Sequence, residues 1–103
     1  MGNPMRIRAT IKGDTTEVKV LMSHPMETGQ RKDSAGAVVP AHFITTVVAH
    51  HNDREVLSAE WGAAVSQNPF LQFSFKGGAA GDKVKVSWTD NKGDTRTDEV
   101  ALA

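Results

Sequence analysis

The sequence contains no cysteine, which removes a wide range of chemistry from this 103-residue chain. Disulfide bonds, thiolate nucleophiles, iron–sulfur clusters and cysteine-ligated zinc all need a thiol and are therefore excluded. Any metal ion would have to be bound by the 4 histidines and the carboxylates. Net charge is lacking as well, because 12 lysines and arginines balance 12 aspartates and glutamates. We therefore expect neither nucleic acid nor a membrane surface as a partner.

Long hydrophobic runs are also absent. No run of about 18 apolar residues occurs, so no segment is expected to span a bilayer. The basic start of the chain is not followed by the apolar stretch of a secretory signal, which by itself indicates that the chain does not direct its own export. Residues 1–4 precede the periodic pattern and are interpreted as an extended start or a cloning remnant, and residues 5–103 as a single domain.

Almost every remaining segment has a period of two, which is typical of β-strands, and no long stretch has helical spacing. We predict about seven short strands with turns between them. They cover residues 5–12, 15–22, 41–51, 54–61, 70–76, 83–89 and 95–101. Such a number of strands in a chain of this length predicts an all-β, immunoglobulin-like antiparallel β-sandwich. A small β-barrel is the alternative.

The hairpin formed by residues 41–51 and 54–61 is predicted to have apolar side chains on both faces. If its two turn residues are Asn52 and Asp53, the facing pairs are His50 with Glu55, Val48 with Leu57, Thr46 with Ala59, and Ile44 with Trp61. The opposite face then carries Phe43, Val47 and Ala49, opposite Val56. That face is more hydrophobic than a solvated surface requires, which indicates contact with a partner.

The histidines are the obvious metal ligands or bases, but their spacing does not bring them together. His42 and His50 share a face of one predicted strand and would lie roughly 26 Å apart. His50 is interpreted as a cross-strand partner of Glu55, while His51 points the other way. The Ser-His pair ending at His24 lacks the strand–turn–helix setting of a nucleophile elbow. We therefore predict no catalytic residue, no metal site and no cofactor.

Residues 23–37 are predicted to form one long loop, because they combine turn formers with charged side chains. A loop of roughly 15 residues is unusual in so small a domain and suggests a function. It carries the imidazole of His24, the thioether of Met26 and the cations Arg31 and Lys32. This mixture suits contact with a partner.

Several segments of the chain together resemble the SoxZ family. They are HPMETGQRKD at 24–33, PAHFI at 40–44, NPF at 68–70, KGG at 76–78, GD at 81–82 and WTDNKGD at 88–94. SoxZ proteins are the smaller subunits of the SoxYZ carrier in bacterial thiosulfate oxidation. The resemblance runs from about residue 5 to the end of the sequence.

The resemblance implies an immunoglobulin-like scaffold that is not an enzyme and that forms a heterodimer with SoxY. In that family SoxY holds the sulfur intermediates on a cysteine in a flexible arm, and other Sox enzymes act on them through the complex. A second thiol could divert such an intermediate by thiol–disulfide exchange, which gives the lack of cysteine a chemical reason. The resemblance also implies a periplasmic location, reached together with a partner that bears the export signal.

The predicted partner-binding residues fall into two groups. The apolar group, expected to pack on SoxY, is Phe43, Val47 and Val56. The loop group, expected to border the approach of the SoxY arm or of client enzymes, is His24, Met26, Arg31 and Lys32. Two other functions remain open. One is a metal-binding or redox enzyme on a similar sandwich, such as superoxide reductase with its cysteine-ligated iron, and the other is a homodimeric adhesion-type domain.

Overall fold

The computed structural model describes residues 3–62 and 64–102 of the chain. Within them there are seven β-strands: β1 (Arg6–Lys12), β2 (Thr15–Leu21), β3 (Ile44–His51), β4 (Arg54–Glu60), β5 (Phe70–Lys76), β6 (Lys83–Asp90) and β7 (Thr95–Ala101). No helix in this described part is long and apolar enough to cross a bilayer.

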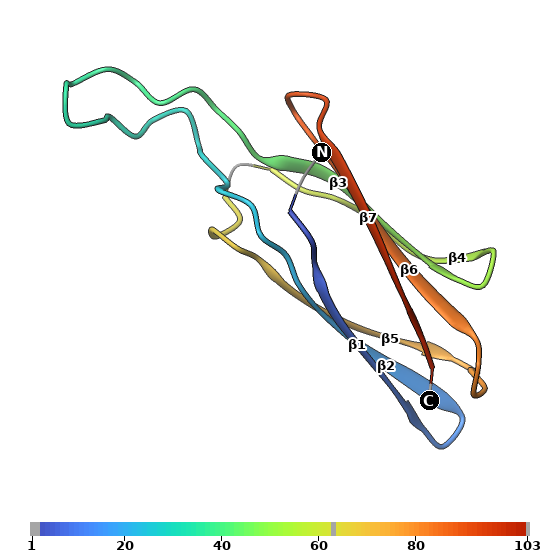
Figure 1. Ribbon diagram of the computed structural model, residues 1–103. Coiled ribbons are helices and arrows are strands. Elements are labelled where there is room, and N and C mark those ends of the chain that lie inside the picture. The colour runs from blue at the N-terminus through green and yellow to red at the C-terminus, as the bar shows by residue number, and fades with distance from the viewer. Residues whose placement is uncertain (1–2, 63, 103) are drawn as a thin grey trace.

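The strands form two antiparallel sheets that pack against each other (Figure 1). One sheet has the order β1-β2-β5 and the other the order β4-β3-β6-β7. Non-consecutive strands pair at β2 with β5 and at β3 with β6, so the chain crosses between the sheets as in Greek-key sandwiches. The prediction of an all-β, immunoglobulin-like β-sandwich is confirmed.

The core lies between the sheets and is built from one face of each strand. Alternate residues of β2 and β6 are buried, as their period of two predicts, because they point inward while their neighbours face solvent. The buried apolar side chains are Met5, Val18, Val20, Met22, Met26, Ile44, Val47, Ala49, Phe75, Val84, Val86, Trp88 and Leu102. Removal of this apolar surface from water is what holds the two sheets together.

The inward face of β3 differs from the prediction. An irregularity between Ile44 and Thr46 shifts the pairing of β3 with β6 by one residue. As a result Ile44 points into the core, and so do Val47 and Ala49 after it, each with no exposed surface. The predicted outward apolar face that included Val47 is therefore wrong.

A second bulge changes the register between β3 and β4. His50 faces Glu55, as predicted, whereas Leu57 faces Ala49 and not Val48. The shift arises because β4 contributes one extra residue at the step between these two pairs. The predicted pair of Thr46 with Ala59 is displaced by one residue, because Ala59 faces Val47 and Thr46 faces Glu60.

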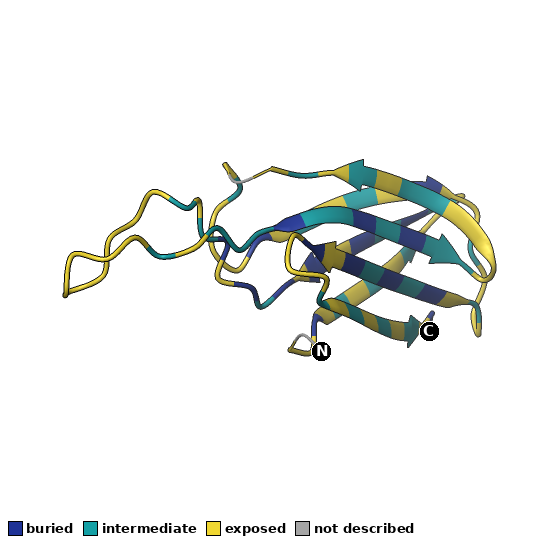
Figure 2. Ribbon diagram, turned by 90° about the horizontal axis from the view of Figure 1, so that it is seen from above, coloured by how far each residue is buried: buried dark blue, intermediate teal, exposed yellow. Residues whose placement is uncertain are grey.

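Residues 27–42 form a two-legged arm that projects from one end of the sandwich (Figure 1). Glu27 and His42 exchange backbone hydrogen bonds of 2.6 and 2.9 Å at its base, and a second bridge joins the legs nearer the tip. Most of the arm is exposed (Figure 2). The molecule accordingly measures 53 Å along its longest axis but only 21 and 20 Å across. The long loop predicted at 23–37 is thus the approach, first leg and tip of this arm.

At the opposite end, the turn between β5 and β6 packs closely against β2. Gly78 has a φ of +110°, which side chains other than glycine rarely adopt, and a Cβ at this position would collide with the hydroxyl of Thr16. That hydroxyl donates a hydrogen bond of 2.7 Å to the carbonyl of Gly77. Residues 77–81 therefore form a close-packed turn that connects β5 in one sheet to β6 in the other, and this turn is not a hairpin.

Candidate functional site

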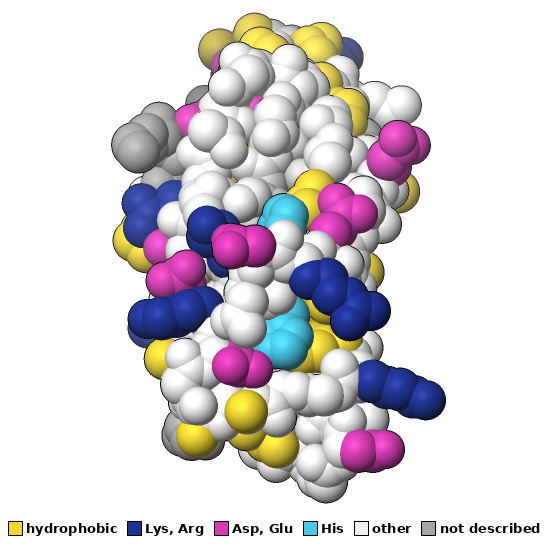
Figure 3. All heavy atoms as spheres, turned by 90° about the vertical axis from the view of Figure 1, so that its right-hand side faces the viewer, with side chains coloured by type: hydrophobic (Ala, Val, Ile, Leu, Met, Phe, Trp, Pro, Cys, Tyr) yellow, Lys and Arg dark blue, Asp and Glu magenta, His cyan; other side chains and the backbone are white. Residues whose placement is uncertain are grey.

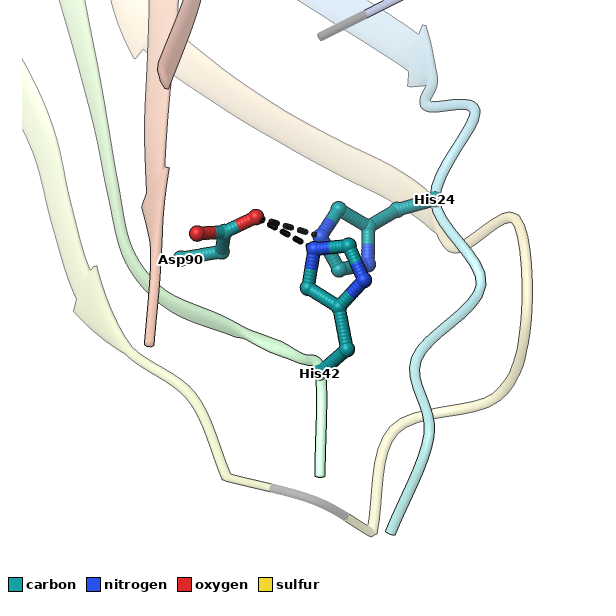
Figure 4. Close-up of side chains that lie close together, drawn as sticks. All are labelled: His24, His42 and Asp90. Carbon is teal, nitrogen blue, oxygen red and sulfur yellow. Dashed lines mark hydrogen bonds and ion pairs between the residues drawn. The ribbon is translucent and has the colours of Figure 1, made fainter. Parts of the chain in front are cut away.

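Three segments of the chain meet where the arm leaves the sandwich. His24 follows the end of β2, His42 precedes the start of β3, and Asp90 is the last residue of β6. Because β3 runs antiparallel to β6 and the chain passes from β2 through the arm into β3, these positions share one end of the molecule. Figure 4 shows both imidazole rings directed at the carboxylate.

Asp90 accepts a hydrogen bond from each histidine on the same oxygen. Its Oδ2 lies 3.1 Å from Nε2 of His24 and 2.8 Å from Nε2 of His42. Its Oδ1 accepts the backbone N–H groups of Lys92 and Asp94, both at 2.9 Å. The carboxylate is fully buried, so these hydrogen bonds replace its lost water. We call His24, His42 and Asp90 the clasp.

Two opposing effects set the pKa of Asp90. Burial would raise this pKa, because the carboxylate loses hydration. The hydrogen bonds from His24 and His42, with those from the backbone of Asp94 and Lys92, outweigh burial and hold the pKa below its ordinary value of 3.8. Asp90 is therefore negatively charged at neutral pH, and the clasp is a buried anion surrounded by N–H donors.

The second ring nitrogen of His24 fixes the position of its proton. Nδ1 accepts the backbone N–H of Met26 at 3.1 Å, so a neutral ring must carry its proton on Nε2, which donates to Asp90. The His24 ring also lies edge-on to Trp88, with 5.0 Å between ring centroids. The indole Nε1 of Trp88 is buried and has no hydrogen-bond partner among the described residues.

A metal ion would require a different protonation of the clasp. Ligand atoms of its three residues lie within 4.8 Å of one another, and two histidines with one carboxylate are a common ligand set for iron. A histidine that binds metal through Nε2 carries its proton on Nδ1, and in His24 that proton would point at the N–H of Met26. The clasp therefore fits a network of hydrogen bonds and does not fit a resident metal ion.

Met26 completes the base of the arm. Its backbone has a φ of +49°, and its Sδ accepts the N–H of Ile44, the first residue of β3, at 3.4 Å. Met26 is 5% exposed and His24 3% exposed. Both were expected as surface groups of a loop, and this expectation is wrong, because both side chains fasten the arm to the sandwich from inside.

The other sequence-predicted partner residues lie nearer the surface. Arg31 and Lys32 are exposed on the arm, but the Arg31 guanidinium is paired, with Nε 2.9 and 3.1 Å from the two carboxylate oxygens of Glu27. The hydrogen bonds from Arg31 lower the pKa of Glu27. Phe43 and Val56 are half-buried and pack against the edge of the core. That these residues contact a partner stays a prediction.

Sequence reasoning missed the clasp because it compared histidines along a single strand. The signal that could have found it is topological. In an antiparallel sandwich, the end of one strand and the start of its neighbour lie at the same end of a sheet. His42 before β3 and Asp90 at the end of β6 satisfy this condition. The arm returns the chain from His24 to His42, so His24 lies at the same end.

Comparison with known proteins bears on both fold and family. The family model described as "Sulphur oxidation protein SoxZ" matches residues 5–101. A crystal structure of superoxide reductase in the oxidized state is similar with a TM-score of 0.67 and 18% identity, over 96% of this chain and 86% of that one. The hypothetical protein PH1083 from Pyrococcus horikoshii OT3 is similar with a TM-score of 0.69 and 18% identity, over 98% and 88%. At this identity the two structures share the fold alone. None of the curated proteins compared with the chain matches it.

Proposed function

Because the chain belongs to the SoxZ family of sulfur oxidation proteins, we propose that it is the non-catalytic subunit of a sulfur carrier and pairs with SoxY. The observation that carries this proposal is the family match, which spans residues 5–101 and hence nearly the whole sequence. SoxY would hold the covalent intermediate on its cysteine. This chain, without cysteine, would offer no competing thiol.

The apolar part of the SoxY interface is proposed along the β3–β4 hairpin. Phe43 and Val56 lie near opposite ends of this hairpin and are both half-buried. β4 is an edge strand, so among the described residues its outer side has no paired strand. Val47, fully buried in the core, is no longer part of the proposed surface.

The arm is proposed to border the place where the SoxY arm or a client enzyme approaches. Lys32 supplies an exposed cation there, and Arg31 is exposed as well, with its guanidinium paired to Glu27. Anionic sulfur groups or acidic client surfaces would be attracted to these cations, and the attraction would weaken with salt. His24 and Met26 would act indirectly, by fixing the base of the arm. We further propose a periplasmic location, with export carried out by a signal on SoxY.

Co-purification with tagged SoxY tests the pairing. The expected result is a stoichiometric heterodimer, in which Phe43→Ala weakens association by about 1–3 kcal/mol because an aromatic anchor is lost. Phe70→Ala is the matched control, since Phe70 is exposed on the other sheet and should leave SoxY affinity unchanged. Consumption of thiosulfate by this chain alone would contradict the proposal, and so would a failure to bind SoxY.

A further inference from the structure

The outer face of the β1-β2-β5 sheet carries far more positive than negative charge. Its outward-pointing charged side chains are Arg6, Arg8, Lys12, Lys19, Lys76 and, as the one acid, Glu17. Glu17 lies 3.3 Å from Lys12 and 3.7 Å from Lys19. The side chains of Arg6 and Arg8, by contrast, form no hydrogen bond or ion pair with any described residue. In a chain of zero net charge, this face concentrates unpaired cations.

The side of the molecule that lies to the right in Figure 1 does not share this bias, since basic and acidic side chains are interspersed there, with histidines between them (Figure 3). Such interspersed charges satisfy one another and create little net field. The excess of positive charge is therefore a property of one face and not of the whole surface.

Two large apolar side chains interrupt the cationic face at the arm end. Leu21 is 44% and Phe70 is 58% exposed, and the pairing of β2 with β5 makes them direct neighbours. The pairing of β1 with β2 places Arg6 on the other side of Leu21. Arg6, Leu21 and Phe70 thus form one row across three strands, with Arg8 beside it. We call these four residues the docking row.

Two hollows border the docking row. The first, of about 270 Å³, is lined by Arg6, Ile7, Arg8, Lys19, Leu21 and Phe70. The second, of about 240 Å³, shares Arg6 and Leu21 and continues to Asn68. Both are smaller than a typical cofactor pocket. Their size and their apolar floor suit a single large side chain of a partner.

We propose that the docking row binds an acidic segment of a client protein, which inserts one apolar side chain beside Leu21 and Phe70. Unpaired guanidinium groups bind carboxylates in a bidentate geometry, so Arg6 and Arg8 select an acidic segment. The apolar pair adds an anchor at the centre of the contact. The SoxY surface proposed above lies on the other sheet, so this site stays accessible in the heterodimer.

An NMR titration of the full ¹⁵N-labelled chain tests the proposal with a defined probe, the acetylated peptide Asp-Glu-Leu-Glu-Asp. Saturable shifts are expected at amides of β1, β2 and β5 near the docking row. A peptide with serine in place of leucine, and one with amides in place of its carboxylates, should each bind about tenfold more weakly. Higher salt should weaken binding of the acidic peptide further.

Substitutions in the row separate specific docking from general charge attraction. Phe70→Ser and Arg6→Glu should each weaken peptide binding by about tenfold, because one removes the anchor and the other repels the carboxylates. Lys76→Glu is the matched control, since it reverses one charge on the same face but does not line either hollow, and it should change binding less than about twofold. The dispersion of each variant's spectrum reports that it is folded.

Several results would overturn the proposal. They are the lack of a saturable shift, shifts centred on the arm, and equal effects of Lys76→Glu and Arg6→Glu. Tighter binding of phosphatidylglycerol vesicles or oligothymidine through the same amides would assign the row to a membrane or to nucleic acid instead. Loss of peptide binding in the SoxY heterodimer would make the row part of that interface. Failure of SoxY to bind at all would contradict the proposed function but leave this titration unaffected.

Discussion

The sandwich and the arm are stabilised by different interactions. Two sheets of the sandwich bury a continuous apolar core, which includes Val18 and Trp88. The arm, residues 27–42, has exposed legs joined by backbone hydrogen bonds, and only its base is buried. The arm is therefore held at its base by the hydrogen bonds of the clasp, whereas the sandwich is held together by burial of apolar surface. The difference indicates that the arm can open locally while the sandwich stays folded.

Trp88→Ala should have the largest effect, and on the sandwich as a whole. Trp88 is 1% exposed, and its removal leaves a cavity that costs about 3–5 kcal/mol. Urea unfolding followed by circular dichroism measures this loss. Leu21→Ala, at an exposed position on a strand, should cost less than about 1 kcal/mol. Similar losses for both variants would show that the core is not where the stability of the sandwich arises.

Asp90→Asn should instead loosen the arm. The new amide has one oxygen where the carboxylate had two. Its NH2 group therefore faces either the two histidines or the backbone N–H groups that bonded the other oxygen, at a cost of about 2–4 kcal/mol. Hydrogen exchange at the amides of Glu27 and His42, which join the two legs, should speed up more than exchange in β6. Asp82→Asn is the matched control. It disturbs a histidine–carboxylate contact with His51 outside the clasp, so exchange in the arm should not change.

Gly78→Ala should destabilise the sandwich and spare the arm. The added Cβ collides with the Thr16 hydroxyl at a positive φ, and the expected cost is about 1–3 kcal/mol. Gly77→Ala separates the two causes, because Gly77 has a φ of +93° but open space around its Cα. A smaller loss at Gly77 is expected. Equal losses would mean that backbone strain alone, and not the close approach of the turn, explains the effect.

Acid should act on both regions, through carboxylates with lowered pKa values. Burial would raise the pKa of Asp90, but the hydrogen bonds from the clasp histidines and the backbone outweigh it and lower this pKa. The hydrogen bond from Arg96 lowers the pKa of Asp98. A lowered folded-state pKa gives stability that is complete above the unfolded value and is lost as pH falls through the folded one. Urea midpoints should therefore decline below about pH 4. In Asp90→Asn this decline should be shallower, and an identical decline would remove Asp90 from the acid response.

Arg31→Ala should have the smallest effect on stability. The ion pair with Glu27 lies on the exposed arm, where solvent screens it. The urea midpoint should be unchanged within error, because neither the core nor the clasp is touched. A clear fall in the midpoint would show that the arm contributes to global folding, against the distinction between the two regions.

Strand positions and most inward faces could be predicted because local patterns determine them. In β6 the alternation of Val84, Val86 and Trp88 with polar residues permits only one inward face. In β3 both alternating sets are apolar or β-branched, so the pattern fits either face equally well. The bulge near Thr45, whose hydroxyl donates to the carbonyl of Thr89, decides between them, and nothing in the local pattern predicts it.

The clasp was beyond prediction for a different reason. Its residues are separated by 18 and 48 positions, and they meet only through the pairing order of the strands. No short motif records such a contact. The docking row is an intermediate case. The alternation of Arg6 and Arg8 with apolar residues indicates an outward cationic edge, but the register of three strands is needed to place Phe70 beside Leu21.

The edge-on contact between Trp88 and His24 gives the protein an internal optical reporter. An indole that is dry and lacks a hydrogen-bond acceptor emits at shorter wavelengths than a hydrated one. Opening of the arm base admits water to this indole, so the emission of Trp88 shifts to longer wavelengths. The chain has 2 tryptophans, and Trp61→Phe leaves Trp88 as the sole emitter. Movement of the arm on binding another protein can then be followed by intrinsic tryptophan fluorescence, without an added dye.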